Sequence, residues 1–274
     1  HQFASAVIGG DMPIWVNEGL ADYFGEAVYT GDSFVSGGVP VYRLKRIQEQ
    51  LDSGKFKPVQ RMMELSHRQW NAEMDPSNYD QAFAMVTFLA HGEDGRYQKA
   101  FGKFMVMLNR GTPWSKAWLE TFGSAQGFED RWATWWKSRP DDAFVDVYAR
   151  ATAQMLTSYL ARATSQRQTF TDLAALTSAI EKGQVKWHKD DAMTPGLRTD
   201  CASLLKALDT LDAKIQLRPP VPAAPGVKPS PQTIVVTLKD GTIFTGTYKL
   251  KGNRVGSVDV KVTEPAAAAP SSAK

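Results

Sequence analysis

The sequence predicts a mainly α-helical protein that ends in a small β module, and three observations lead to this fold class. Apolar residues recur at helical spacing through most of the first 217 residues, in segments that end at glycine or proline. A Pro-rich stretch over 218–232 then interrupts the helical pattern. Beyond it, residues 233–250 alternate apolar and polar side chains around Asp240-Gly241, which is typical of a β-hairpin.

The first helical domain is expected to span residues 1–140. Its segment 31–40 contains several glycines and a proline and is predicted to be a loop. Glycine or proline follows most of the apolar helical segments, as expected at a helix end, because glycine adopts left-handed backbone angles and proline cannot continue a helix. Helices are predicted over 13–25, 41–51 (before Gly54), 79–92 (to Gly92), 96–111 (to Gly111) and 128–140 (to Pro140).

A second helical region is expected over 141–217, with helices at about 142–163, 170–182 and 196–216. The last of these carries a leucine stripe at helical spacing, which indicates a core face or the face of a partner helix. The stripe consists of Leu204, Leu205, Leu208 and Leu211.

The Pro-rich stretch 218–232 is predicted to be an extended, semi-rigid linker. The β module over 233–263 should hold three strands, the third at 255–262, and three strands alone are marginally stable. This module is a possible site of protein or cell-surface contact. The tail over 264–274 is expected to be disordered.

Composition excludes several classes of protein. The 274 residues carry a formal net charge of +3 and contain no dense Lys/Arg block, so no nucleic-acid partner is expected. No apolar run approaches the roughly 18 to 20 residues of a membrane span. The single cysteine, Cys201, excludes an internal disulfide framework.

The stretch PIWVNEGLADYFG (13–25) contains the first candidate functional residues. It places Glu18 and Asp22 four residues apart, on one face of the predicted helix. Like charges at this spacing repel each other by a few tenths of a kcal/mol, about the size of an i,i+4 pair. We therefore expect a positive group beside these two carboxylates.

Asn17-Glu18-Gly19, followed by Asp22, resembles the helix that supplies the third zinc ligand in gluzincin metallopeptidases. In that clan another helix carries His-Glu-x-x-His, whose histidines bind Zn²⁺ and whose glutamate activates water. The resemblance implies that Glu18 is a zinc ligand. It implies that Asn17 and Asp22 support the site without touching the metal, Asp22 by orienting a zinc-bound imidazole.

His1 lies 17 positions before Glu18, close to the spacing between the second histidine and the glutamate ligand in the aminopeptidase N branch. The resemblance therefore implies that His1 is a zinc ligand and the last residue of His-Glu-x-x-His. We expect the rest of that motif to precede His1 in a longer protein. The chain as given should then be an inactive fragment that binds Zn²⁺ weakly.

The stretch NYDQAFAMVTFL (78–89) resembles the aminopeptidase helix whose tyrosine hydroxyl donates a hydrogen bond to the oxyanion of the tetrahedral intermediate. The resemblance implies this catalytic role for Tyr79. Gln81-Ala82 departs from the Lys-Gly that is usual there. The alternative is that Tyr79 is an ordinary packed core residue.

With HGEDGRYQKAF (91–101), residues 1–140 are similar to the bacterial peptidase-MA-like proteins. The resemblance implies the helical C-terminal lobe of a zinc peptidase, which hydrolyses a peptide or protein substrate through a metal-activated water. The alternative is a degenerate, non-catalytic gluzincin-like protein that binds partners or cell surfaces. An appended module behind a Pro-rich linker fits an exported protein in either case. His67 and His91 are expected to be surface or supporting residues rather than ligands.

Overall fold

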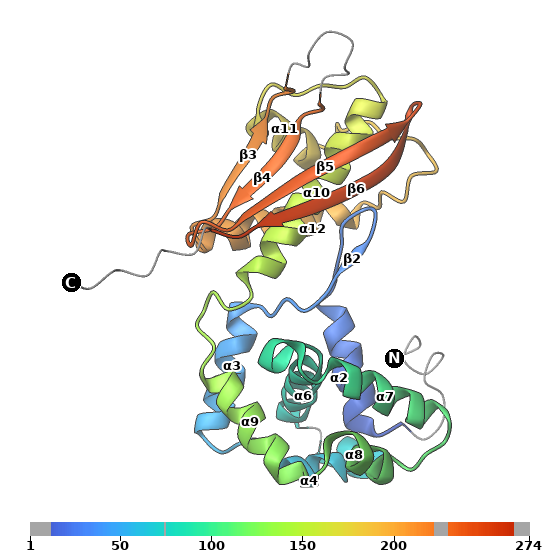
Figure 1. Ribbon diagram of the computed structural model, residues 1–274, viewed down its shortest axis with the longest axis vertical. Coiled ribbons are helices and arrows are strands. Elements are labelled where there is room, and N and C mark those ends of the chain that lie inside the picture. Colours follow the sequence, from blue (N-terminus) through green and yellow to red (C-terminus); the bar gives the residue numbers. More distant parts are fainter. Residues whose placement is uncertain (1–11, 74, 222–229, 266–274) are drawn as a thin grey trace, which may run out of the picture. The chain divides into compact units, whose positions relative to one another are not determined.

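The computed structural model describes residues 12–73, 75–221 and 230–265. The chain is mainly helical, with eleven helices in these described ranges and 55% helical residues, and a four-stranded antiparallel sheet lies near the carboxyl end. The mainly α fold with a small β module is thus confirmed. The chain divides into two compact units, 1–27 with 36–144 and 28–35 with 145–274 (Figure 1).

Unit 1 is built of helices, and those predicted from apolar spacing are present. The short helices α4, α5 and α8 were not predicted. The helices of this unit are α2 (Ile14–Gly25), α3 (Val41–Asp52), α4 (Val59–Met63), α5 (His67–Glu73), α6 (Pro76–Gly95), α7 (Gln98–Asn109), α8 (Trp114–Phe122) and α9 (Ala125–Lys137).

Helices α2 and α6 pack closely, and Gly19 makes this possible. A Cβ atom at this position would lie 2.5 Å from the carbonyl oxygen of Ala82, a distance that no side chain could accept. The glycine after Glu18 therefore sets the spacing between the two helices. Helix α6 breaks at Gly92, where the backbone becomes extended, so the helix end predicted there is confirmed.

The core of unit 1 is aromatic. Trp15 of α2 lies against Phe104 and Trp118, with ring centroids 6.4 and 6.0 Å apart. Trp132 and Trp136 of α9 are fully buried. Each such side chain contributes roughly 1.5 to 3 kcal/mol when it leaves water. This burial holds α2 at a fixed place among the other helices of the unit.

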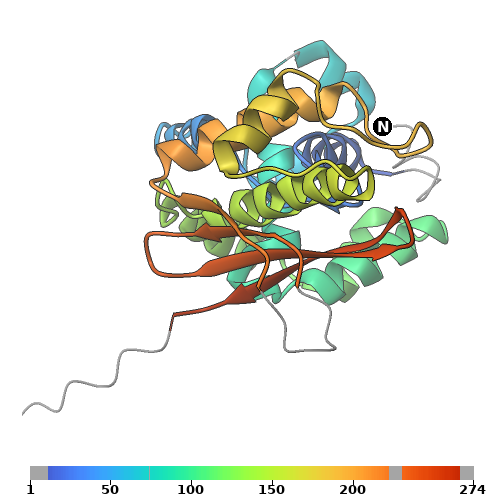
Figure 2. The same cartoon turned by 90° about the horizontal axis from the view of Figure 1, so that it is seen from above.

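Unit 2 packs helices against one face of the sheet, whose strand order is β3-β4-β5-β6. Figure 2 views the sheet nearly edge-on, with α10 along one face and α12 beyond α10. Gly246 of β5 lets α10 approach the sheet closely, because a Cβ atom at this glycine would collide with the hydroxyl of Thr157 on α10. The elements are α10 (Val145–Ser165), α11 (Leu173–Glu181), α12 (Gly196–Thr210), β3 (Lys214–Arg218), β4 (Thr233–Thr237), β5 (Ile243–Lys251) and β6 (Arg254–Thr263).

The helix predicted over 196–216 was too long. Helix α12 ends at Thr210, and Asp212 adopts a left-handed backbone conformation (φ 56°). Lys214–Arg218 instead forms β3, which pairs antiparallel with β4, so the sheet has four strands rather than three. The alternating side chains of Ile215 and Leu217 pack against the buried cluster of unit 2, which a helix continued here could not achieve.

The segment predicted as a loop over 31–40 contains half of a short hairpin, formed by β1 (Val28–Tyr29) and β2 (Phe34–Val35). Arg162 of α10 holds the turn of this hairpin. Its guanidinium donates to both carboxylate oxygens of Asp32, at 3.0 and 3.1 Å, and to the carbonyl of Gly31 at 3.0 Å. The hairpin therefore belongs to unit 2. No helix within the described ranges is long and apolar enough to cross a membrane.

Candidate functional site

Four of the predicted site residues lie on two packed helices of unit 1. Asn17, Glu18 and Asp22 are on α2, and Tyr79 is in the first turn of α6. His1 lies outside the described residues. Asp22 and Tyr79 share a cavity of about 420 Å³, which Arg43, Arg46, Gln50, Pro76 and Asp80 also line.

The Glu18 carboxyl is only partly exposed, and its pKa is raised above the usual 4.5. Burial is the main cause, since it penalises the charged form. The negative charge of Asp22, one turn further along α2, raises the pKa further. His67, at the start of α5, acts in the opposite direction. Burial and Asp22 together therefore disfavour the anionic form of Glu18.

Asp22 is neutralised by an arginine that the sequence did not predict. The guanidinium of Arg43 on α3 donates to the Asp22 carboxylate and, at 2.9 Å, to that of Glu26. Arg43 is only 7% exposed, and its guanidinium lies 3.8 Å from the ring centroid of Phe83. The positive group expected beside Asp22 is thus present, but it is a structural arginine rather than a metal-bound histidine among the described residues.

The same arginine reaches the buried carboxylate of Asp80, next to Tyr79. Asp80 is 4% exposed and accepts two hydrogen bonds of 2.6 Å from Arg46 and one of 3.0 Å from Gln50. The Nε of Arg43 lies 3.4 Å from it. We call the resulting set the carboxylate–arginine network; it links α2, α3 and α6 and consists of Asp22, Glu26, Arg43, Arg46 and Asp80.

Two features of the sequence hint at this network. Asp80 is a charged residue directly before the apolar run of α6, and Arg43 stands beside Leu44 on the buried side of α3. Charged side chains in such places are buried only when they are paired. Their pairing could not be predicted from the sequence, because 37 positions separate the two.

Asn17 and Tyr79 each present a polar atom without a described partner. The Oδ1 of Asn17 is buried and accepts no hydrogen bond within the described part of the chain. Tyr79 is 40% exposed, so its ring is not that of a packed core tyrosine. The ring lies edge-on to Trp70, with centroids 5.2 Å apart. Its hydroxyl bonds to none of the residues that the structure describes, and it is accessible to a ligand in the cavity.

The described ranges contain no group of three His, Cys, Asp or Glu residues that could hold a metal ion. They do contain the Glu18 carboxylate, an oxygen donor of the kind that binds zinc. A dication beside Glu18 would favour the anionic carboxylate that burial and Asp22 disfavour. Glu18 is therefore chemically suited to be a metal ligand, whereas the Asp22 carboxylate is held by Arg43 and His1 lies outside the described residues.

His91 has a structural role in this part of the unit. Its Nε2 lies 2.7 Å from the hydroxyl of Tyr23, and the two rings stack with centroids 5.7 Å apart. Burial lowers the pKa of His91 below the usual 6.5, which favours the neutral ring. Its partner Tyr23 also donates to Ser36, at 3.2 Å.

No protein-family model, curated protein or solved structure matches this chain. The candidate site therefore rests on the contacts of its own residues. Those contacts place Asp22 and Tyr79 at one cavity and Glu18 one helical turn from Asp22.

Proposed function

We propose that unit 1 forms the helical part of a zinc-dependent peptidase site, in which Glu18 is a metal ligand and Tyr79 a hydrogen-bond donor to the substrate. The observation that carries this proposal is the difference between two neighbouring carboxylates on α2. Asp22 has a buried arginine to balance its charge, whereas the pKa of Glu18 is raised. A bound cation would favour the anionic form of Glu18, which burial and Asp22 disfavour.

The division of roles follows from the network. Arg43 holds the Asp22 carboxylate on the α3 side of α2. The negative charge of Asp22 then repels that of Glu18, and Asp22 is not itself a ligand. Glu18 supplies a carboxylate, the hard oxygen donor that catalytic zinc sites combine with two imidazoles. One of these imidazoles is His1 in this proposal, and the resemblance assigns the second, with the general base, to a His-Glu-x-x sequence before His1.

Bound zinc supplies an activated water and polarises the carbonyl of the scissile bond. The residues of this chain contribute orientation and charge. Tyr79 stands at the cavity mouth with its hydroxyl free of described protein partners, so it can donate to an oxygen that becomes negative during hydrolysis. Trp70 limits the positions of the Tyr79 ring.

The test uses the full-length natural protein. Zinc content is measured by mass spectrometry and hydrolysis by cleavage of a fluorescent peptide library. Glu18→Gln should lose bound zinc and hydrolysis together, because an amide is a much weaker zinc ligand than a carboxylate. Glu49→Gln, on the exposed side of α3, is the matched control and should keep both. Full zinc content in Glu18→Gln would remove Glu18 from the metal site.

The second candidate is a non-catalytic binding protein that retains the gluzincin scaffold. The carboxylate–arginine network favours it, because a buried arginine already compensates Asp22 without any metal. In that case the wild-type protein would hold no zinc at saturating concentrations, and neither Glu18→Gln nor Tyr79→Phe would alter any hydrolysis. The zinc content of the wild type decides between the two.

A further inference from the structure

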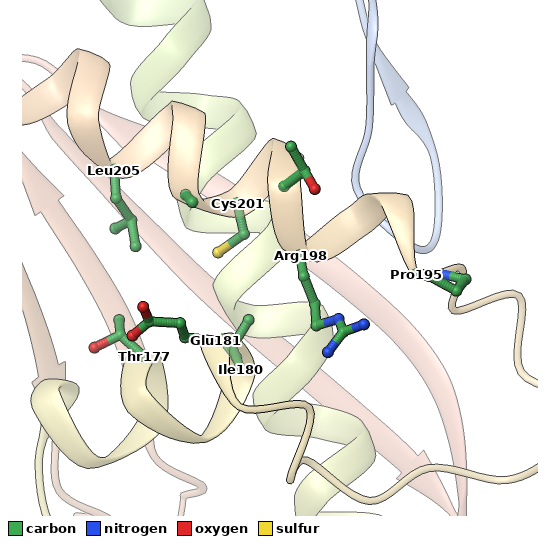
Figure 3. Close-up of a pocket in the computed structure, with 9 residues that line it drawn as sticks. Thr177, Ile180, Glu181, Pro195, Arg198, Cys201 and Leu205 are labelled. Carbon is green, nitrogen blue, oxygen red and sulfur yellow. The ribbon is translucent and has the colours of Figure 1, made fainter.

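Unit 2 contains a cavity of about 590 Å³ between α11 and α12, well apart in sequence from the proposed peptidase residues. Its size is within the range of about 300 to 1,000 Å³ that is usual for small-molecule sites. Figure 3 shows side chains of α12 pointing toward those of α11 across this space. Its principal lining residues are Thr177, Ile180, Glu181, Arg198, Cys201 and Leu205.

Two opposite charges border the cavity. The side chains of Arg198, in the first turn of α12, and Glu181, at the end of α11, form no hydrogen bond or ion pair within the described ranges. In Figure 3 the guanidinium of Arg198 and the carboxylate of Glu181 lie on opposite sides of Ile180 and do not point toward each other. Each is therefore available to a different end of one ligand.

The position of Arg198 is shaped by a neighbouring glycine. Gly183 follows α11 with a left-handed backbone (φ +65°), and its N–H donates to the carbonyl of Ile180 at 3.0 Å. A Cβ atom at Gly183 would lie 2.6 Å from Nη1 of Arg198. The guanidinium therefore lies against Gly183, and the end of the arginine side chain would have to shift if this position carried a Cβ atom.

The floor between the two charges is apolar. Ile180 and Cys201 are almost fully buried, and Leu205 is partly buried beside them. Burial raises the pKa of the Cys201 thiol to about 12, so the thiol is neutral at physiological pH and contributes contact area. An apolar floor between a cation and an anion is complementary to a molecule with two charged ends and an apolar side chain.

We propose that this cavity binds a short unblocked peptide. The ligand's carboxylate pairs with Arg198, its ammonium with Glu181, and its side chain packs on Ile180, Cys201 and Leu205. A guanidinium suits this role because it binds a carboxylate through two parallel hydrogen bonds. The inference is independent of the proposed peptidase activity, since it uses only residues of unit 2.

The experiment is a titration of the full chain with defined probes. Binding is measured by isothermal titration calorimetry and by the NMR chemical shifts of the α11 and α12 amides. The probes are leucine, the dipeptide Ala-Leu, N-acetyl-Ala-Leu and Ala-Leu-amide. We expect Ala-Leu to bind more tightly than leucine, because the two charged groups of leucine are bonded to one carbon and cannot reach both sides of the apolar floor. Blocking either end should weaken binding about tenfold or more, the scale of one lost charge-assisted hydrogen bond.

Variants test the residues. Arg198→Ala should weaken binding of the unblocked probe about tenfold or more, and this variant should bind the unblocked probe and the amide equally well. Glu181→Ala should bind the unblocked probe and the acetylated form equally well. Lys206→Ala, exposed on the same helix and outside the cavity, is the matched control and should bind normally. Circular dichroism verifies that each variant is folded. The proposal is overturned if Ala-Leu does not bind at 10 mM, about the weakest useful affinity, or if Arg198→Ala and Lys206→Ala bind equally.

Discussion

Arg43 of α3 forms an ion pair with Asp22 of α2, one helical turn beyond Glu18. The same guanidinium approaches Asp80 of α6, the residue after Tyr79. One buried side chain therefore fixes the two helices that carry the proposed metal ligand and the proposed oxyanion donor. The orientation of both residues depends on a helix that contributes no predicted site residue of its own.

Arg43→Met should destabilise the protein strongly. It leaves the Asp80 carboxylate and two partly buried carboxylates with one cation fewer, and breaking a buried pair in this way costs about 3 to 5 kcal/mol. Urea unfolding followed by tryptophan fluorescence measures the change. Lys45→Met, on the same helix and in an exposed pair with Asp141, should cost less than about 1 kcal/mol. Equal losses would show that the network contributes little.

Glu18→Gln should change how stability depends on pH in the metal-free chain. Because the pKa of Glu18 is raised in the folded state, the folded protein binds this proton more tightly than the unfolded chain. The wild type therefore loses stability from this group as pH rises through 4.5 to the raised folded value. The melting temperature of the variant, relative to wild type, should be higher at pH 7 than at pH 4, and a constant difference would contradict the assignment.

Tyr79→Phe should separate catalysis from folding. The hydroxyl has no protein partner among the described residues, so its loss should leave the melting temperature and the zinc content unchanged. Turnover of a peptide substrate by the natural protein should fall about 100-fold, the effect of removing one oxyanion donor. Tyr42→Phe, at a more exposed tyrosine on α3, serves as the control. Unchanged turnover in Tyr79→Phe would remove this residue from the site.

Arg162→Met should destabilise unit 2 by about 3 to 5 kcal/mol, because the buried guanidinium holds Asp32 and the Gly31 carbonyl of the hairpin. The measurement is hydrogen exchange of the hairpin amides together with thermal unfolding. Arg150→Met, exposed on the same helix, should change both only slightly. Unaltered exchange in the Arg162 variant would mean that the hairpin is held by its other contacts.

His91→Gln should remove an acid-sensitive loss of stability. Because burial lowers the pKa of His91, the unfolded chain takes up this proton at a higher pH than the folded protein. The wild type then loses stability as pH falls through 6.5 toward the lower folded value, and the variant lacks this contribution. Urea midpoints of both proteins between pH 7.5 and 5.0, a window around the usual histidine pKa, measure the difference.

Much of the helical fold could be predicted because its signals are local. Gly111 follows its helix with a left-handed backbone (φ +78°), and the predicted ends at Gly92 and Gly111 are both found. Strand β3 was missed because its partner β4 lies beyond the Pro-rich stretch, and its alternation follows directly on the leucine stripe of α12. The hairpin at 28–35 was missed for a similar reason, since Arg162 lies 130 positions after Asp32.

The candidate site could be predicted only where one helix carries it. Glu18 and Asp22 share a face of α2 by simple periodicity, and this required no knowledge of the fold. The partner of Asp22 could not be found in this way, because Arg43 reaches it from another helix. The arrangement of Arg198 and Glu181 likewise depends on how α11 and α12 pack, to which the sequence offered no guide.

The hairpin at 28–35 belongs to unit 2, although the residues before and after it belong to unit 1. The polypeptide therefore crosses between the two units three times. During synthesis on the ribosome, Asp32 emerges long before Arg162 exists to bind it. Asp32 therefore has no Arg162 to pair with until α10 has been made, and the second unit is complete only when residues 28–35 are included. A protease cut at 144–145 would leave the two products connected through Asp32 and Arg162 rather than release them.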